Sequence, residues 1–273
     1  MTKETDFANE ADLVAAFVAH VEGWNANPNR KTSKWTVYPE TAGWDLLLVD
    51  EVGVQIGIEA KMALNAKVIC QALPHATWAT ADGPDYRAVL VPSKGTQGNF
   101  HPITQALGLT VIEVSRRTPD WGGKLWVQIQ PSSLPDEHSG FDWDLQRWVS
   151  WLPSRRCQLP DYVPDVQGGK PSPVALTAWK IKAIKLMILL ERRGGVTRRD
   201  MNHLGISASR WTDNYHGFLR ADRLKGMYVR CERTPDLRAQ HPTNWQQIEA
   251  DFAKWAPADL LAANDTEAKD DAA

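Results

Sequence analysis

The sequence predicts an α/β protein in which helices flank a mixed β-sheet, followed by a small second domain that is largely helical. Three observations support this prediction. A length of 273 residues exceeds the usual size of one domain. Short segments rich in β-branched and aromatic residues alternate with segments of helical periodicity in the first half. A stretch rich in proline and tryptophan, residues 131–171, then separates this half from a second set of helical segments.

The chain begins with a helix and three strands. Leu13, Phe17 and Val21 repeat at helical spacing, and Asn9 or Asp6 can cap the start, so a helix is expected over residues 9–22. Three strand-like segments follow, at residues 34–38, 44–50 and 54–62. The turn-like residues 50–53 between the last two predict a hairpin.

The rest of the first domain, residues 1–130, alternates helices and strands. A helix is expected from residue 65 to 80, with a kink or an end near Pro74. Apolar runs of strand length occupy residues 87–91 and 109–114, with a short helix over 103–107 between them. Residues 126–129 can add an edge strand. This alternation predicts a mixed sheet with helices on its faces.

The second domain, residues 172–256, has the element order of a winged helix. A strong helix covers residues 176–191 and ends at Gly194 and Gly195, and Thr197 can cap a second helix over 198–204. After a turn at 205–207, Ser207 or Ser209 can start a third helix through Leu219. Residues 223–231 can form a strand pair, and a last helix is expected over 244–255. The acidic tail, residues 257–273, is expected to be disordered.

Charge is distributed unevenly along the chain. Residues 170–230 hold thirteen Lys and Arg against four acids, an excess of +9, whereas the whole chain carries −2. A winged helix with this excess is expected to bind DNA, with its turn and third helix at the major groove. The expected contacts are Arg198, Arg199, Ser209, Arg210, Asn214 and, at the tip of the wing, Lys225. A solvated surface or a protein-binding winged helix remains an alternative.

Several classes of protein are disfavoured. No apolar run reaches the roughly 18 residues of a membrane span, and the acidic start of the chain does not resemble a secretory signal, so a cytoplasmic protein with no membrane partner is expected. Three widely spaced cysteines suggest neither disulfides nor a zinc site, and buried, reduced thiols are expected. The seven scattered histidines form no metal-binding pair.

One constellation carries chemistry. Asp45 opens a predicted strand, and Glu59, Ala60 and Lys61 close the next. Residues two apart on a strand share a face, so Glu59 and Lys61 point the same way, and the hairpin can bring Asp45 beside them. Two carboxylates and the Ala60 carbonyl offer the hard oxygen ligands that Mg²⁺ takes, and Mn²⁺ is possible there. Such an ion can lower the pKa of a water that attacks a phosphodiester.

These residues resemble the PD-(D/E)XK nuclease superfamily over roughly residues 8–115. The resemblance lies in a helix with an acid, Glu10, the hairpin with Asp45, the run from Glu59 to Lys61, and Gln71 on the next helix. Trp44 stands where the motif has proline. The resemblance implies a restriction-endonuclease-like core in a subgroup with a C-terminal winged helix. It implies Mg²⁺ on Asp45, Glu59 and the Ala60 carbonyl, a catalytic Lys61, and support from Glu10 and Gln71.

The expected function is therefore Mg²⁺-dependent hydrolysis of DNA phosphodiester bonds. A homodimer is a possible form of the enzyme. Simpler explanations remain: Glu59 and Lys61 as solvated charges on a sheet edge, Asp45 as a turn residue, Glu10 on a solvated helix face, and Gln71 bonded to nearby backbone. A DNA-binding regulator on a nuclease fold that does not cut, or an enzyme that acts on RNA, would also fit the sequence.

Overall fold

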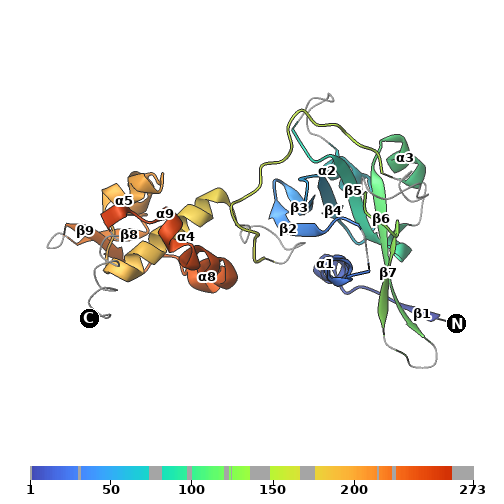
Figure 1. Ribbon diagram of the computed structural model, residues 1–273, viewed down its shortest axis with the longest axis horizontal. Helices are drawn as coiled ribbons and strands as arrows, with labels where there is room; N and C mark the ends of the chain where they lie inside the picture. Colours follow the sequence, from blue (N-terminus) through green and yellow to red (C-terminus); the bar gives the residue numbers. More distant parts are fainter. Residues whose placement is uncertain are drawn as a thin grey trace. The chain divides into compact units, whose positions relative to one another are not determined.

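A computed structural model of the protein comprises two compact units (Figure 1). The N-terminal unit comprises residues 1–159 and 166–175, and the C-terminal unit comprises residues 160–165 and 176–273. The structure describes residues 2–29, 32–73, 82–96, 100–119, 123, 125–135, 148–166, 176–213, 215–222 and 226–259. Stretches predicted as linker or tail at 136–147, 167–175 and 260–273 lie outside these residues.

The N-terminal unit is built on a mixed seven-stranded sheet. Its strands are β1 (Thr2–Thr5), β2 (Trp35–Thr41), β3 (Trp44–Asp50), β4 (Gln55–Ala60), β5 (Tyr86–Pro92), β6 (Thr110–Pro119) and β7 (Trp126–Gln130). Strands β2, β3 and β4 form an antiparallel meander, while β4, β5 and β6 run parallel. The helical elements are α1 (Glu10–Ala26), α2 (Ala66–Ala72), the 3₁₀ helix η1 (Ser93–Thr96) and α3 (Phe100–Ala106). The predicted mixed sheet flanked by helices is confirmed.

Strand β6 is long enough to hold three neighbours. Arg116 and Arg117 pair with both β1 and β7, so these two strands lie on opposite edges of β6. Glu113 and Val114 each pair with one residue of β5 and one of β7, which puts β5 on the edge of β6 opposite β7 and on the same edge as β1. Strand β1 was not foreseen from the sequence.

Each face of the sheet has its own core. Leu46, Leu48, Ile56 and Ile58 pack with α1 on one face. The alternate residues of β3, Leu47 and Val49, pack with α2 on the other face. Helices α1 and α2 thus lie on opposite faces of the sheet (Figure 1). This alternation follows from the two-residue period of a strand. All six residues of β4 are buried, because β4 lies between β3 and β5 with both faces covered.

Part of the stretch predicted as linker packs onto the N-terminal unit. The Gln55 side chain donates to the Cys157 carbonyl at 2.9 Å and accepts from the Cys157 amide at 2.8 Å. The guanidinium of Arg87 lies 5.0 Å from the ring of Trp151 and 5.4 Å from that of Trp44, and donates to the Ala72 carbonyl. These contacts fix residues 148–159 against β3, β4 and β5.

The C-terminal unit contains six helices and a hairpin within its described residues. The helices are α4 (Ala178–Arg193), α5 (Arg198–His203), α6 (Ala208–Thr212), α7 (Leu237–Gln240), α8 (Pro242–Ala250) and α9 (Phe252–Trp255). The hairpin pairs β8 (Leu219–Asp222) with β9 (Met227–Arg230). Val196, between α4 and α5, adds an antiparallel bridge to Tyr228 of β9.

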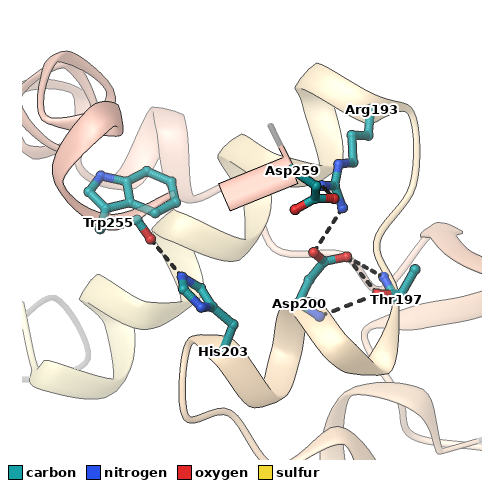
Figure 2. Close-up of polar contacts among 6 residues, drawn as sticks. All are labelled: Arg193, Thr197, Asp200, His203, Trp255 and Asp259. Atoms are coloured by element: carbon teal, nitrogen blue, oxygen red, sulfur yellow. Dashed lines mark hydrogen bonds and ion pairs between the residues drawn. The ribbon is translucent and has the colours of Figure 1, made fainter. Parts of the chain in front are cut away.

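A polar network ties the end of α4 to the start of α5 (Figure 2). Thr197 caps α5 by accepting from the Asp200 amide, and the Asp200 carboxylate accepts from the Thr197 amide at 2.8 Å. Arg193 donates to the buried Asp200 at 2.8 Å and also pairs with Asp259. The His203 ring donates to the Trp255 carbonyl at 2.9 Å. The network fixes the orientation of α5 relative to α4 and α9.

Four local predictions are wrong. The last helix, expected over residues 244–255, is divided into α8 and α9 at Asp251. The third helix of the second domain ends at Thr212, because the Asp213 carboxylate accepts from the amides of Tyr215 and His216 and makes a turn there. The first strand of the predicted pair is β8, which precedes residue 223. The cysteines are not buried: Cys70 is exposed, and Cys157 and Cys231 are intermediate.

In the part of the chain that the structure describes, no helix is long and apolar enough to cross a membrane.

Gly57 of β4 is expected to be essential for stability. A Cβ atom there would lie 2.4 Å from the Trp44 ring, so Gly57→Ala should lower the unfolding free energy of the N-terminal unit by about 1–3 kcal/mol. Gly23 on α1 is the matched control, because nothing lies within 4 Å of its Cβ position, and Gly23→Ala should stabilise the helix by up to about 1 kcal/mol. Urea denaturation of both variants checks this, and equal effects would contradict it.

Candidate functional site

Asp45 and Glu59 lie side by side on adjacent strands. The β3–β4 ladder pairs Leu46 with Ile58, so the next pair along the two strands is Asp45 and Glu59. Asp45 also accepts a hydrogen bond from the Ala60 amide at 2.8 Å through its carboxylate. The Asp45 carboxylate thus accepts from a backbone amide where the β3–β4 ladder ends. This hydrogen bond holds the Asp45 side chain next to the residue that precedes Lys61.

Glu59 is the most unusual side chain of this cluster. It is 5% exposed, no hydrogen bond or ion pair to it is found among the described residues, and its carboxylate oxygens are not fully shielded from solvent. Burial, with a smaller contribution from the nearby charge of Asp45, raises the pKa of Glu59 to about 8, although the Lys61 ammonium acts in the opposite direction. A buried carboxylate without a partner is unfavourable as an anion, so Glu59 needs either a proton or a cation beside it.

Lys61 and Glu10 complete the cluster. The Lys61 ammonium donates to the Glu10 carboxylate at 2.9 Å, and both side chains are partly exposed. Burial lowers the pKa of Lys61, but the hydrogen bond to Glu10 and the charges of Asp45, Glu10 and Glu59 outweigh it, so the pKa is raised. Burial likewise raises the pKa of Asp45, against the lowering effect of the Ala60 hydrogen bond and Lys61. The structure therefore brings together Glu10, Asp45, Glu59 and Lys61.

Glu40 is a neighbour that the sequence did not suggest. On β2 it falls between the pairs Pro39–Leu46 and Thr41–Trp44, so it stands opposite Asp45. Its φ of +48° lies in the left-handed region, which a residue with a side chain seldom adopts. Its charge contributes to the raised pKa of Glu59. The predicted strand ended at residue 38, so the pairing that places Glu40 beside Asp45 was not visible in the sequence.

Gln71 is not drawn into the cluster. It is exposed on α2, where the buried residues are Val68, Ile69 and Ala72, and no hydrogen bond joins it to Asp45, Glu59 or Lys61. Asn65 caps this helix by accepting from the Val68 amide. A supporting role of Gln71 therefore remains a prediction.

The donor chemistry of the cluster fits a hard divalent cation. The carboxylates of Asp45 and Glu59 are adjacent, and burial raises the pKa of both. A cation bound between them would offset the free-energy cost of burying each carboxylate as an anion. Among the described residues, however, no three His, Cys, Asp or Glu side chains are placed to hold a metal ion together. Asp45 and Glu59 thus offer oxygen ligands of the kind that a hard cation binds. A third carboxylate, such as Glu10, would have to move closer to these two to complete a metal site.

The predicted DNA contacts lie on the C-terminal unit. Arg198, Arg199, Ser209 and Arg210 are exposed on α5 and α6, whereas Asn214 and Lys225 lie outside the described residues. Arg198 donates to the Tyr228 hydroxyl of β9 at 3.1 Å. Ser209 shares a hydrogen bond with Ser207. The exposed cations at these positions form no salt bridge with a described acid.

Other arginines of this unit are paired. Arg230 and Arg238 both contact Glu191, at 2.6 and 2.8 Å, and Arg192 lies 3.9 Å from Glu249. Their charges are thus partly neutralised along α4 and α8. Among the described cations, those of α5 and α6, and also Lys182 and Lys185 of α4 and Arg220 of β8, form no salt bridge with a described acid.

A separate polar cavity of about 690 Å³ lies along α3 and β6. Its lining includes His101, Thr104, Glu113 and Gln130, and the His101 ring lies 2.8 Å from the Glu113 carboxylate. None of the carboxylates of the Asp45 cluster lines it. No local pattern in the sequence predicts this cavity, since its walls come from a short helix and two strands.

Comparison with known proteins adds no assignment: no protein-family model, no curated protein and no solved structure matches the chain.

The raised pKa of Glu59 predicts a pH-dependent stability. A protonated Glu59 favours the folded state, so its contribution is complete below its ordinary value of 4.5 and is lost as the pH rises towards 8. Glu59→Gln mimics the protonated form, and should therefore be more stable than wild type in metal-free buffer at pH 8.5, with the difference shrinking towards pH 4.5.

Thermal denaturation at several pH values in the presence of a chelator tests this. Glu51→Gln, in the exposed β3–β4 turn, is the control and should show no such trend. A difference between Glu59→Gln and wild type that does not change with pH would refute the burial argument.

Proposed function

We propose that this protein is a divalent-metal-dependent nuclease that hydrolyses DNA phosphodiester bonds at the cluster of Glu10, Asp45, Glu59 and Lys61. The observation that carries the proposal is Glu59, a buried carboxylate without a hydrogen-bond partner beside a second carboxylate and an ammonium. Perturbed acids grouped with a lysine are typical of sites that act on charged substrates.

The order of elements supports the proposal. Helix α1 precedes the antiparallel meander β2, β3 and β4, and α2 then leads to β5, which runs parallel to β4. This order agrees with a restriction-endonuclease-like core, with Asp45 and Glu59 on the two strands where the PD-(D/E)XK resemblance requires them. The position of Glu10 at the start of α1, bonded to Lys61, is a further point of agreement.

The residues have distinct roles in this proposal. Mg²⁺ or Mn²⁺, held by Asp45, Glu59 and the Ala60 carbonyl, would polarise the phosphoryl oxygen and lower the pKa of an attacking water. Glu59 would lose its proton when the ion binds. Lys61 would release Glu10 and place its ammonium near the water or the developing negative charge. Glu10 is then available as a further ligand or as a base for the water.

The C-terminal unit would hold the DNA. The order of α4, the Val196 bridge, α5, α6 and the β8–β9 hairpin is consistent with a winged helix. Unpaired cations on α5 and α6 would meet the phosphates, and the residues of α6 would approach the groove. A homodimer would let two such cores act on two strands, but nothing in the fold requires it.

A second candidate is a DNA-binding protein that does not cut. It is favoured by one observation, that the described side chains do not form a complete metal-binding group. In that protein Lys61 and Glu10 would remain an ion pair, and Glu59 would remain protonated near neutral pH.

Cleavage assays separate the two candidates. Wild type should cut plasmid DNA in Mg²⁺ or Mn²⁺, while Glu59→Ala and Lys61→Ala should each lower the rate by about a hundredfold or more, because charge stabilisation in the transition state is lost. Glu51→Gln is the control and should cut like wild type. If wild type binds DNA but cuts it in neither metal, the second candidate is established. Cleavage of RNA alone would mean that the substrate is RNA and not DNA.

Glu40→Gln provides a graded test of the same site. Removing the negative charge of Glu40, which lies opposite Asp45, should lower the pKa of the Glu59 carboxyl slightly, so the pH at which cleavage reaches half its maximum should fall relative to wild type. The pH–rate profile in Mg²⁺ measures this. A profile that shifts to higher pH would mean that Glu40 does not act on Glu59 through its charge.

The salt dependence of DNA binding tests the C-terminal unit. Replacing Arg198 and Arg199 by Ala should reduce the slope of log affinity against log salt by about 1 to 2, because each lost phosphate contact releases one counterion fewer. Arg238→Ala is the matched control, since its guanidinium is already paired with Glu191. Equal changes in slope for the two variants would place the DNA elsewhere on the unit.

A further inference from the structure

An aromatic and basic patch lies where α4, α6 and the α5–α6 turn meet. We define the patch by Trp179, Lys182, Gly205 and Arg210. The Arg210 guanidinium lies 5.8 Å from the Trp179 ring centroid. The Lys182 ammonium donates to the Gly205 carbonyl at 3.3 Å, one turn along α4 from Trp179. These contacts place the ring and both cations on one surface of the C-terminal unit.

The indole of Trp179 is both exposed and held in place. It is 38% exposed, an unusual state for the largest side chain, and its ring lies 5.9 Å from that of Trp211 at an angle of 31°. Trp211 is fully buried and also contacts Phe218 edge-on. Because Trp179 rests on this fixed core, a partner that stacks on it would cost little ordering of the side chain.

The charge around the ring favours an anionic partner. Lys182 and Arg210 make no salt bridge with any described acid, whereas Arg230 and Arg238 of the same unit are paired with Glu191. The exposed Arg198 and Arg199 of α5 add to the positive charge of this helical pair. A flat apolar ring bordered by cations suits a ligand that combines flat rings with phosphates.

We infer that Trp179 and Arg210 form a stacking site for an unpaired base of a nucleic acid, with Lys182 near its phosphate. The bases of an intact duplex are stacked on one another and, away from its ends, show only their edges, so along a strand an indole can stack only where the bases are unpaired. This inference rests on the proposed function, and it narrows the substrate to DNA with single-stranded segments, such as overhangs, forks or flaps.

Binding assays on the full-length protein in a chelator, which prevents cleavage, test the inference. Trp179→Ala should weaken binding of a labelled single strand by about tenfold, the scale of one lost stacking contact, and leave the affinity for a blunt duplex within about twofold. Trp179→Phe should keep most of the affinity. Trp126→Ala, which removes a tryptophan of similar exposure, 40%, from the N-terminal unit, should change neither.

A fluorescent base analogue at the unpaired position gives a direct readout. If the indole is the stacking partner, binding to wild type should quench the emission of the analogue strongly. Binding to Trp179→Phe should quench it less, and binding to Trp179→Ala should leave it unquenched. Circular dichroism shows that each variant is folded.

The outcomes distinguish the two proposals. Equal losses on single strand and duplex, or no loss on either, would overturn the stacking site while cleavage by wild type still supports the nuclease. Binding of an acidic peptide in competition with the strand, without quenching of the base analogue, would identify the patch as a protein-binding surface instead. Failure of wild type to bind any nucleic acid would reject the DNA-binding role of this unit as well.

Discussion

The burial of β4 is the constraint on which the candidate site depends. Strands β3 and β5 border it and both faces are covered, so even its last charged residue, Glu59, is 5% exposed. A carboxylate in such a place loses its hydration, and the pKa of Glu59 rises to about 8. Lys61 could compensate the charge but is bonded to Glu10. The sheet thus creates a position that favours a proton or a metal ion.

The charged residues near the end of β4 together affect the protonation of Glu59. Asp45 bonds the Ala60 amide, and so keeps its own negative charge next to Glu59 instead of turning to solvent. Glu40, opposite Asp45, adds to the same field. Removing any one of these charges should alter the others, because interacting groups titrate as a set. The segment near Trp151 closes the other side of the sheet by covering Arg87.

In the C-terminal unit, ion pairing sorts the arginines by surface. Glu191 and Glu249 pair with Arg192 of α4, Arg230 of β9 and Arg238 of α7, whereas Lys182 of α4 and the arginines of α5 and α6 form no salt bridge with a described acid. The Arg193–Asp200 contact and the Thr197 cap hold α5 in position (Figure 2). An exposed Trp179 beside Arg210 then adds an apolar ring to a basic surface. Both proposals for this unit use this sorting of charges.

The sequence by itself determined the strands and most helices, because two-residue and 3.6-residue periods record which side chains face a core. It also placed Asp45, Glu59 and Lys61 at strand ends. Only the tertiary structure decided that β1 joins β6, that Glu40 stands opposite Asp45, and that Gln71 is exposed. Strand register, burial and the pKa values that follow from them depend on contacts between distant segments, which no local pattern encodes.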